Sequence, residues 1–459
     1  MARRSETGPD PTRQAGARAW CWYNWADHGW ATPIAAVLVG PWMLALAVAA
    51  VGKRGVLVGV GPLVLHADAF PSAMITLAAI VQLFALPLVG ARVDTRGAKR
   101  RWLVGSCLVG SGICIALGAT HGADWIAAGL LFLAGSLVEG VSDLTWQGML
   151  PELADDGAGL DALSARGTAV GYLGAGVVLA VELAVVDLHA ELGMTKETAV
   201  RACFALAGLW WLGFGLPALL RLAPAARGRA IAPEHTWRRL RADWRVLAGE
   251  RNATRYLLAY LCFGDAMSAV IALASTFLTN ALFHDDTTKA TPFLFELILM
   301  IQFVAMGGAV AAGRLARRFG AKAVLVASLV LWSAVIVYAY AGLHDELDAV
   351  VAGAIIGVGL GVTAALARSL FASMIPVGRE ASFFSIYEVT SQGTAFFAPL
   401  LFTVVVDITG SFRQAILSLI VLFVLGLVLL ARTDTDAASA AARALPAEPA
   451  GGARPSREP

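Results

Sequence analysis

Long apolar stretches separated by short charged clusters run through most of the chain. A helix that crosses the hydrocarbon core of a membrane needs about 20 mostly apolar residues. The pattern therefore predicts a set of membrane-spanning helices. The predicted helices cover residues 20–48, 71–91, 102–120, 124–147, 166–187, 199–221, 255–282, 293–314, 321–343, 348–371, 383–408 and 413–431.

The segments between and beyond these stretches divide the chain into parts. Residues 222–254 form the longest connection, and Trp237, Leu240, Trp244 and Leu247 recur there at the spacing of a short surface helix. We expect six-helix bundles over 20–221 and 255–431 on either side of this loop, a polar N-terminal tail over 1–19 and a disordered tail over 432–459, which is rich in Ala, Pro and Asp.

Composition agrees with a membrane protein. Of the 459 residues, 58% are hydrophobic and 15% charged, and the mean hydropathy is +0.70. Soluble domains are about 45–50% apolar and about 25% charged. These values exclude disordered, collagen-like and coiled-coil chains and predict an all-α polytopic membrane protein embedded in a lipid bilayer. The formal net charge of +2 gives no sign of a nucleic-acid partner.

The five cysteines all lie in apolar stretches, so they indicate neither a disulfide framework nor a metal site. We therefore expect no metal and no cofactor, and we expect the protein to be a monomer. Arg and Ala are abundant, which suggests a GC-rich bacterial genome and hence a multi-pass protein of the plasma (inner) membrane.

Basic residues are distributed unevenly between alternate loops. All but six of the 35 Lys and Arg residues lie in the tails and in one set of loops. Cytoplasmic loops carry an excess of Lys and Arg, so both termini and the loop 222–254 are predicted to be cytoplasmic. The six exceptions are Lys53, Arg54, Lys196, Arg201, Lys289 and Arg413.

The two predicted bundles repeat each other. A shift of about 223–225 residues aligns the segment from Gly90 to Lys99 with the segment from Gly313 to Lys322, as expected for a parallel repeat. Met149-Leu-Pro151 and Met374-Ile-Pro376 align at the same shift. Six helices, a basic loop and six more helices form the parallel-repeat plan of a secondary transporter.

The repeated loop from Gly90 to Arg101 resembles the G-x-x-x-D-R-x-G-R-K-R signature of the major facilitator superfamily. Other stretches are similar to the vacuolar-effluxer family within it, named for the autophagy-related amino-acid effluxer of fungal vacuoles. These stretches are Trp22-Tyr-Asn-Trp-Ala-Asp27-His28-Gly-Trp-Ala-Thr32, Met149-Leu-Pro-Glu152-Leu-Ala, Arg166-Gly-Thr-Ala-Val-Gly-Tyr172-Leu-Gly, Gly264-Asp265, Gly313 to Lys322, Ala367-Arg368-Ser-Leu-Phe-Ala-Ser-Met-Ile-Pro376 and Gly378-Arg-Glu-Ala-Ser-Phe-Phe.

The resemblance implies the twelve-helix major facilitator fold and export of a small polar solute, such as an amino acid, by rocker-switch alternating access. Two positions depart from the family pattern. The first span of the family reads Y-D-x-A-N-S, whereas here Asn24 and Asp27 exchange the acid and the amide and His28 replaces a hydroxyl residue. Where the family tends to have a Lys in span 11, this chain has Glu388 and Gln392.

Ionisable residues within membrane spans are costly and usually face a partner or a water-filled space. Asn24, Asp27 and His28 share one face of span 1 because they are three and four residues apart. The resemblance places spans 1 and 7 beside a central cavity, so Asp27 and Asp265 are predicted as a pair of carboxylates that bind protons or solute. The alternative is that each accepts hydrogen bonds from a neighbouring helix and only fixes packing.

Spans 4, 10 and 11 supply further candidates. Glu139 and Asp143 share a face of span 4, and the repeat places Arg368 of span 10 at the depth of Asp143. Glu139 is the better candidate for transport chemistry because it lies one turn deeper than Asp143. Glu388 and Gln392 share a face of span 11, although Glu388 could also occupy a solvated helix end.

The resemblance also implies a gate at the cytoplasmic end of the bundle. The residues concerned are Asp94, Arg96, Gly97, Lys99, Arg100, Asp143 and Arg368. In the superfamily, basic groups of the loop between spans 2 and 3 pair with an acid at the end of span 4, so Asp143 is expected to be the latch. Asp94 is expected to cap the start of span 11, where a helix N-terminus favours a negative charge. Permanent structural ion pairs are the alternative for Asp143 and Arg368.

Three functions remain to be compared. The favoured one is a proton-coupled secondary transporter that exports a small polar solute. A membrane-embedded enzyme is not favoured, because the chain contains no H-E-x-x-H, G-x-S-x-G or phosphate-loop motif. A transport-inactive receptor or scaffold on the same fold stays open as the alternative.

Overall fold

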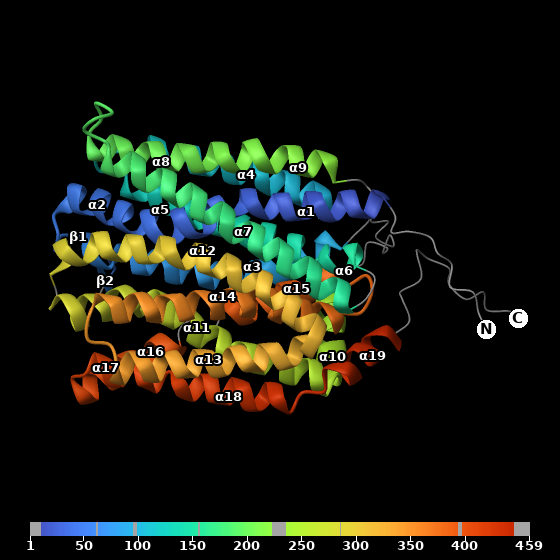
Figure 1. Ribbon diagram of the computed structural model, residues 1–459. Coiled ribbons are helices and arrows are strands. Elements are labelled where there is room, and N and C mark those ends of the chain that lie inside the picture. The colour runs from blue at the N-terminus through green and yellow to red at the C-terminus, as the bar shows by residue number, and fades with distance from the viewer. Residues whose placement is uncertain are drawn as a thin grey trace, which may run out of the picture.

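The computed structural model describes residues 11–60, 63–94, 99–154, 157–222, 236–284, 286–392 and 397–444, and almost all of them are helical. The helices lie side by side along one axis (Figure 1). In the first part of the chain they are α1 (Pro11–Gly29), α2 (Val39–Val51), α3 (Phe70–Val93), α4 (Lys99–Ala119), α5 (Trp125–Gln147), α6 (Leu150–Leu153), α7 (Gly157–Asp187), α8 (Lys196–Trp210) and α9 (Leu216–Arg221). In the second part they are α10 (Thr236–Gly249), α11 (Arg251–Phe283), α12 (Thr287–Phe319), α13 (Ala321–Ala341), α14 (Glu346–Ser373), α15 (Glu380–Gln392), α16 (Phe397–Thr409), α17 (Phe412–Ser418), α18 (Ile420–Ala431) and α19 (Thr435–Ala444).

Shorter segments connect some of these helices. A π-helix (Trp30–Leu38) joins α1 to α2, a second one (Trp211–Gly215) joins α8 to α9, and a 3₁₀ turn (Ala67–Ala69) leads into α3. Pro33 lies inside the first π-helix, where its missing N–H cannot continue the α-helical hydrogen bonds.

Eleven helical segments in the described part of the chain are long and apolar enough to cross a membrane. They coincide with eleven of the predicted apolar stretches. The remaining stretch, 383–408, is divided between α15 and the shorter apolar helix α16, and residues 393–396 between them lie outside the described residues.

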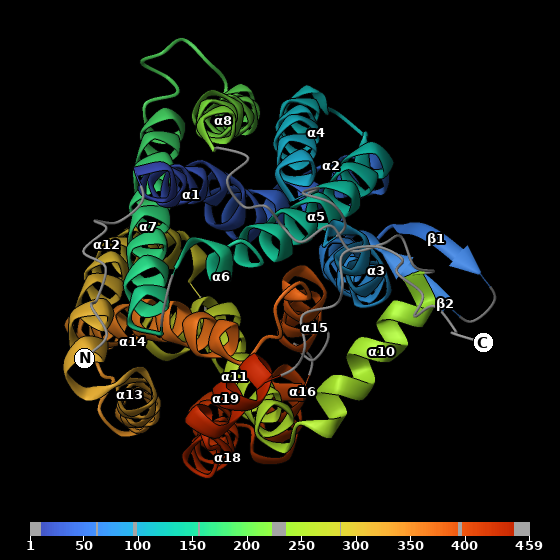
Figure 2. The same cartoon turned by 90° about the vertical axis from the view of Figure 1, so that its right-hand side faces the viewer.

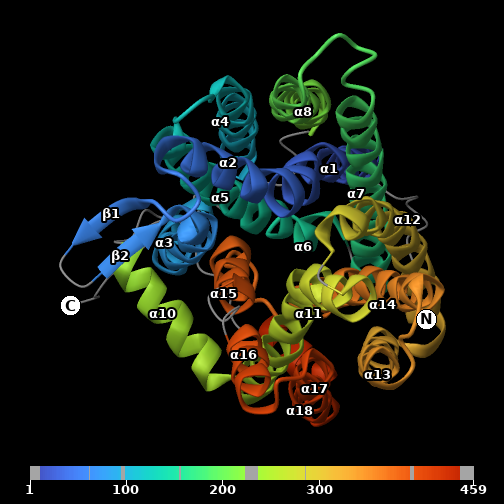
Figure 3. The same ribbon diagram turned by 90° about the vertical axis from the view of Figure 1, so that its left-hand side faces the viewer.

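The two ends of the bundle differ. At one end lie α6, α10 and α19, and we call it the α10 end (Figure 1). At the other end two strands, β1 (Val56–Val60) and β2 (Leu63–His66), pair antiparallel. We call it the hairpin end. The hairpin lies beside α3 (Figure 3) and is a departure from the all-α class predicted from the sequence.

Both predicted tails contain helix. The first span begins at Pro11 rather than at residue 20, and Arg13 donates a hydrogen bond to the Ala154 carbonyl at 2.8 Å. The expectation of disorder throughout 432–459 is wrong for α19, because Ala is the best helix former and the Asp434 carboxylate accepts the Ala437 amide at 2.9 Å. Ala438 and Ala442 are buried there. Residues 1–10 and 445–459 lie outside the described part.

The helices form two groups when viewed from the α10 end (Figure 2). The helices α1 to α9 lie on one side, the helices from α11 onward lie on the other, and α10 runs along an edge between them. The groups touch where α7 crosses α12 and α14 and where α3 lies along α15. These contacts decide which polar residues of the two halves meet.

The predicted surface helix in the loop 222–254 is present as α10, but its buried face differs from the apolar one expected. Arg239, Asp243 and Leu247 are buried, whereas Trp237 and Trp244 are exposed. α10 therefore presents charged groups to the bundle.

Candidate functional site

Ionisable side chains from both halves gather where α1 and α5 meet α14 and α15. We call Asp27, Glu139, Asp143, Arg368 and Glu388 the central cluster. The carboxyl groups of Asp27, Asp143 and Glu388 each act electrostatically on Glu139, and the guanidinium of Arg368 acts on Asp143. Asp27 and Glu388 are buried, whereas the other three side chains keep part of their surface exposed. The structure thus brings together acids that lie far apart in the sequence.

A residue of the neighbouring helix α5 forms a hydrogen bond with Asp27. Its Oδ1 atom accepts a hydrogen bond from the Ser142 hydroxyl at 3.0 Å, and that hydroxyl is also 2.7 Å from the Tyr23 hydroxyl. This short chain of polar groups fixes the position of the Asp27 carboxylate at the edge of the central cluster.

The other two residues on this face of α1 are directed toward α7. Asn24 donates a hydrogen bond to the Gly167 carbonyl at 2.9 Å and so ties α1 to α7. A Cβ atom at Gly171 would overlap the Asn24 amide and lie 2.9 Å from the His28 ring, so glycine is needed at Gly171 for this approach. His28 is half-buried, and the positive charge of Arg368 acts on its ring.

Glu388 and Arg368 belong to the second half, and both contact residues of the first half. Gln147 donates a hydrogen bond to the Glu388 Oε1 atom, and Glu388 is 5% exposed. Glu388 therefore does not occupy the solvated end left open by the sequence. The Arg368 guanidinium lies 4.3 Å from the centroid of the Trp146 ring, a cation–π arrangement. Gln392 ends α15, and its side chain is outside the described part.

Asp265 is not brought together with Asp27. Its Oδ2 atom accepts the backbone amide of Ala398, the second residue of α16, at 2.8 Å. The first amides of a helix lack partners within the helix, and an acidic side chain is a good acceptor for them. Asp265 therefore holds the start of α16, and its Oδ1 atom has no hydrogen-bond partner in the described part of the chain.

A second group of charges joins the halves at the α10 end. Lys99, the first residue of α4, lies 3.4 Å from Asp94, 2.6 Å from Glu152 and 3.0 Å from Glu380. The Asp94 carboxylate accepts the amides of Ala381 and Ser382, each at 2.9 Å, in the first turn of α15. Asp94 and Lys99 belong to the first half and Glu380 to the second, so these contacts hold the two halves together.

The helix α10 completes this group from the side. Asp243 is fully buried and accepts hydrogen bonds from Arg379 and from the Ser382 hydroxyl. Arg239 lies 3.7 Å from Asp94. We call the set formed by Asp94, Lys99, Glu152, Arg239, Asp243, Arg379 and Glu380 the closure network.

The pKa values of the carboxyl groups in the closure network are shifted in opposite directions. Burial raises the pKa of Asp94 to about 6, against the opposing charges of Lys99 and Arg239. Burial also raises the pKa of Asp243, although Ser382 and Arg379 act to lower it. For Glu380, burial is outweighed by Lys99 and by the Gly378 amide, and its pKa is lowered.

Part of the predicted gate is arranged differently. Asp143 is not among the partners of Lys99, because α5 ends at Gln147 and the acid at the level of Lys99 is Glu152 on the following helix α6. Arg100 donates to the carbonyls of Leu219 and Leu220 at the end of α9 and so caps that helix. Arg96 and Gly97 lie outside the described residues.

The two halves lie close together beside the closure network. A Cβ atom at Gly90 of α3 would lie 2.6 Å from the Ser385 Cβ and 2.8 Å from the Ala381 carbonyl oxygen. One at Gly148 would lie 3.1 Å from the Cα atom of Ala381. Side chains larger than hydrogen do not fit between these helices at Gly90.

Sequence reasoning missed many of the residues that join the halves. They include Gln147, Glu152, Arg239, Asp243, Arg379 and Glu380, and also the pair Asp161 and Ser369 between α7 and α14. A signal was present for two of them, since Glu152 and Glu380 lie within the stretches Met149-Leu-Pro-Glu152 and Gly378-Arg-Glu that carried the family resemblance. None of the described His, Cys, Asp and Glu groups is arranged to hold a metal ion.

Comparison with known families gives a match along nearly the whole chain. Residues 12–443 match the model of the family described as vacuole effluxer Atg22 like. An uncharacterised MFS-type transporter, YxiO of Bacillus subtilis, is 23% identical over 426 residues, covering 91% of this chain and 95% of the relative. The autophagy-related protein 22-1 of Aspergillus niger is 30% identical over 296 residues, which cover 60% of this chain and about half (47%) of that longer protein.

Solved structures of the major facilitator superfamily share the fold. The fucose:proton symporter FucP of Escherichia coli superposes with a TM-score of 0.67 at 12% identity, covering 92% of this chain and 98% of that one. A bacterial homologue of the iron transporter ferroportin gives a TM-score of 0.63 at 14% identity, with 92% and 98% covered. At these identities the likeness concerns the fold alone.

Proposed function

The chain belongs to the Atg22-like vacuole effluxer family of MFS-type membrane transporters, and we propose that it exports a small polar solute by proton-coupled alternating access. Amino acids are the first solute class to test, because the resemblance to the amino-acid effluxer of fungal vacuoles implies them and a zwitterion suits the mixed charges of the central cluster. YxiO matches along almost its full length, which supports a place in a bacterial cell membrane.

The observation that carries this proposal is the central cluster. Four carboxyl groups and one guanidinium meet between the halves, with Asp27 and Glu388 buried. Carboxylates that share one site repel one another when all are ionised, so the site favours the binding of protons or of a cation. A site that gains or loses protons as it is exposed to one side and then the other is what proton coupling requires.

The closure network supports the alternating-access part of the proposal. It joins the halves at the α10 end and also binds the helix N-terminus of α15. Charged contacts of this kind can separate into water, where ions are well solvated. In the proposed cycle the network breaks to open the α10 end and re-forms to close it. The presence of both the central cluster and the closure network favours a transporter over a transport-inactive receptor.

We propose that the α10 end faces the cytoplasm, as the distribution of Lys and Arg predicts. Single cysteines at positions 235 and 440 should then resist a membrane-impermeant thiol reagent applied outside intact cells and react after permeabilisation. The native cysteines are suitable for this background because all five are buried. A cysteine in the hairpin, at Val58, should react from outside. Labelling of 235 and 440 in intact cells, with Val58 silent, would reverse the orientation.

Reconstitution into vesicles tests the function itself. We expect purified protein in proteoliposomes to exchange internal radiolabelled amino acids for external ones, at rates at least several-fold above protein-free vesicles. A pH gradient should drive net accumulation, because the proposed carrier moves protons with solute. If the protein exchanges none of a panel of amino acids, small amines and sugars, the receptor alternative is favoured.

A further inference from the structure

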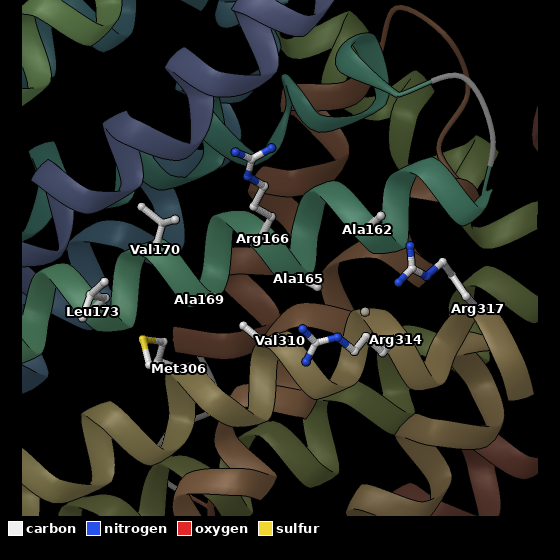
Figure 4. Close-up of a pocket in the computed structure, with 11 residues that line it drawn as sticks. Ala162, Ala165, Arg166, Ala169, Val170, Leu173, Met306, Val310, Arg314 and Arg317 are labelled. Carbon is white, nitrogen blue, oxygen red and sulfur yellow. The ribbon is translucent and has the colours of Figure 1, made fainter. Parts of the chain in front are cut away.

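A groove of about 400 Å³ lies between α7 and α12, where one helix of each half crosses the other (Figure 4). On the α7 side it is lined by small and apolar residues together with Arg166. On the α12 side Met306 and Val310 are followed by Gly313, Arg314 and Arg317. This groove lies apart from the central cluster and the closure network, and none of its residues takes part in either of them.

The groove changes character along its length. The helix α12 reaches the α10 end at Phe319, so Arg317 and Arg314 lie two and five residues from that end. Met306 lies about 20 Å from the same end at about 1.5 Å per residue. On α7, which begins at the α10 end, Ala162, Arg166 and then Leu173 follow in the same order of depth. Both walls therefore pass from basic near the membrane surface to apolar in the hydrocarbon layer.

The basic end of the groove has no anion in the described part of the chain. Arg166, Arg314 and Arg317 are exposed, and no carboxylate among the described residues forms an ion pair with them. The two helices lie close together at Gly313, where a Cβ atom would lie 2.9 Å from the Ala165 Cβ. The apolar wall beyond this point stays accessible, since Val310 is 38% exposed.

We propose that the groove binds an anionic phospholipid from the leaflet at the α10 end. Guanidinium groups bind phosphate oxygens through paired hydrogen bonds, and Arg314 and Arg317 share one face of α12 because they are three residues apart. The acyl chain then lies along Val170, Leu173, Met306 and Val310. A soluble phosphate would satisfy only the basic end, whereas the phospholipid fills both parts.

A lipid in this groove affects the conformational equilibrium of the transporter. Its headgroup touches α12 of the second half and its acyl chain touches α7 of the first, so it is bound by both halves at once. A ligand stabilises the conformation that binds it better. The bound lipid therefore favours the arrangement in which α7 and α12 are in contact, the one seen here.

Native mass spectrometry of the purified full-length chain tests the binding. The protein is delipidated in detergent and titrated with phosphatidylglycerol or with phosphatidylcholine of the same acyl chains. We expect at least one phosphatidylglycerol to bind about tenfold more tightly than phosphatidylcholine. The triple variant Arg166→Gln, Arg314→Gln, Arg317→Gln should lose this tenfold preference and bind both lipids about equally, because basic groups near the membrane surface are what attract an anionic headgroup.

Two matched variants separate the parts of the site. Arg318→Gln removes a charge from the same end of α12, outside the groove, and should bind phosphatidylglycerol as the wild type does. Val310→Trp should reduce phosphatidylglycerol binding at least threefold while leaving all the arginines in place, because it fills the acyl-chain part. Equal binding of both lipids, or an equal loss in Arg318→Gln and the triple variant, would overturn the proposal.

Competition identifies the source of the phosphate. Water-soluble glycerol phosphate at millimolar concentration should not displace phosphatidylglycerol; full displacement would show that the arginines bind a free anion and that the apolar wall is unused. All of these readouts are independent of solute transport, so they can fail or succeed whatever the result of the proteoliposome assay.

Discussion

Lys99→Met is expected to lower the population of the form closed at the α10 end by about a hundredfold or more. Lys99 is buried and faces three carboxylates, so its removal leaves Asp94, Glu152 and Glu380 in a buried site without their shared cation. Removing one partner of a buried ion pair costs about 3–5 kcal/mol, and about 1.4 kcal/mol corresponds to a tenfold change in population. When the halves separate, these carboxylates regain water, so the cost falls on the closed form.

Two measurements follow this change. Spin labels at Arg221 and Val377, which are exposed on different halves at the α10 end, should move apart in the variant. Solute exchange should fall at least tenfold, because the cycle requires closure at this end. Arg101→Met provides the control, since it removes an exposed charge two residues along the same helix.

A second substitution makes the test specific. If Lys99 acts by neutralising the acid of the other half, then Glu380→Gln added to Lys99→Met should restore part of the closed population, because it removes one of the uncompensated charges. Glu380→Gln alone should weaken closure. A Lys99→Met variant with the wild-type label distance and wild-type exchange would show that the closure network does not control the switch.

Asp27→Asn is expected to abolish accumulation driven by a pH gradient while retaining exchange of labelled for unlabelled solute. The amide keeps an oxygen for the Ser142 hydroxyl, so the local packing is preserved, but it cannot take up a proton. Exchange needs no net proton movement, whereas accumulation does. The comparison of accumulation with exchange in one proteoliposome preparation measures this difference.

Asp265→Asn serves as the control for this prediction. Its side-chain oxygen can still accept the Ala398 amide at the start of α16, so we expect accumulation within about twofold of the wild type, in line with a cap that costs little to replace by Asn. If Asp27 instead binds the amino group of the solute, Asp27→Asn will lose exchange and accumulation together. Full accumulation by Asp27→Asn would remove this residue from proton coupling.

The membrane spans could be predicted from the sequence because hydropathy reports directly on contact with lipid. The ends could not. Residues 11–19 of α1 are polar, and they are helical because they pack on other segments, as Arg13 shows at the Ala154 carbonyl. Local pattern does not reveal where a helix is held by a distant side chain such as Asp265.

The candidate site was accessible to sequence reasoning wherever one helix face or the internal repeat carried the signal. The shared face of Asn24 and Asp27 and the equivalence of Asp143 with Arg368 are of this kind. The contacts of Lys99 are not, because Glu152 and Glu380 come from segments with no fixed spacing to it. The buried face of α10 was misjudged for a related reason. An apolar side chain is usually buried and a charged one exposed, but here Trp237 is exposed and Arg239 is buried. The burial of Arg239 is explained by the acids of the closure network that lie beside it.

The close approach at Gly90 and Gly148 has a consequence for the speed of the proposed cycle. At Gly90 the Ser385 side chain lies against the glycine, and at Gly148 the backbone after α5 lies against that of Ala381. Leu86 and Val93 of α3 pack with Ala381 of α15 in an apolar cluster beside them. Separating the halves here therefore breaks apolar packing as well as the ion pairs, and salt screens buried ion pairs little. Turnover should respond to the size of the side chain at Leu86 more than to ionic strength.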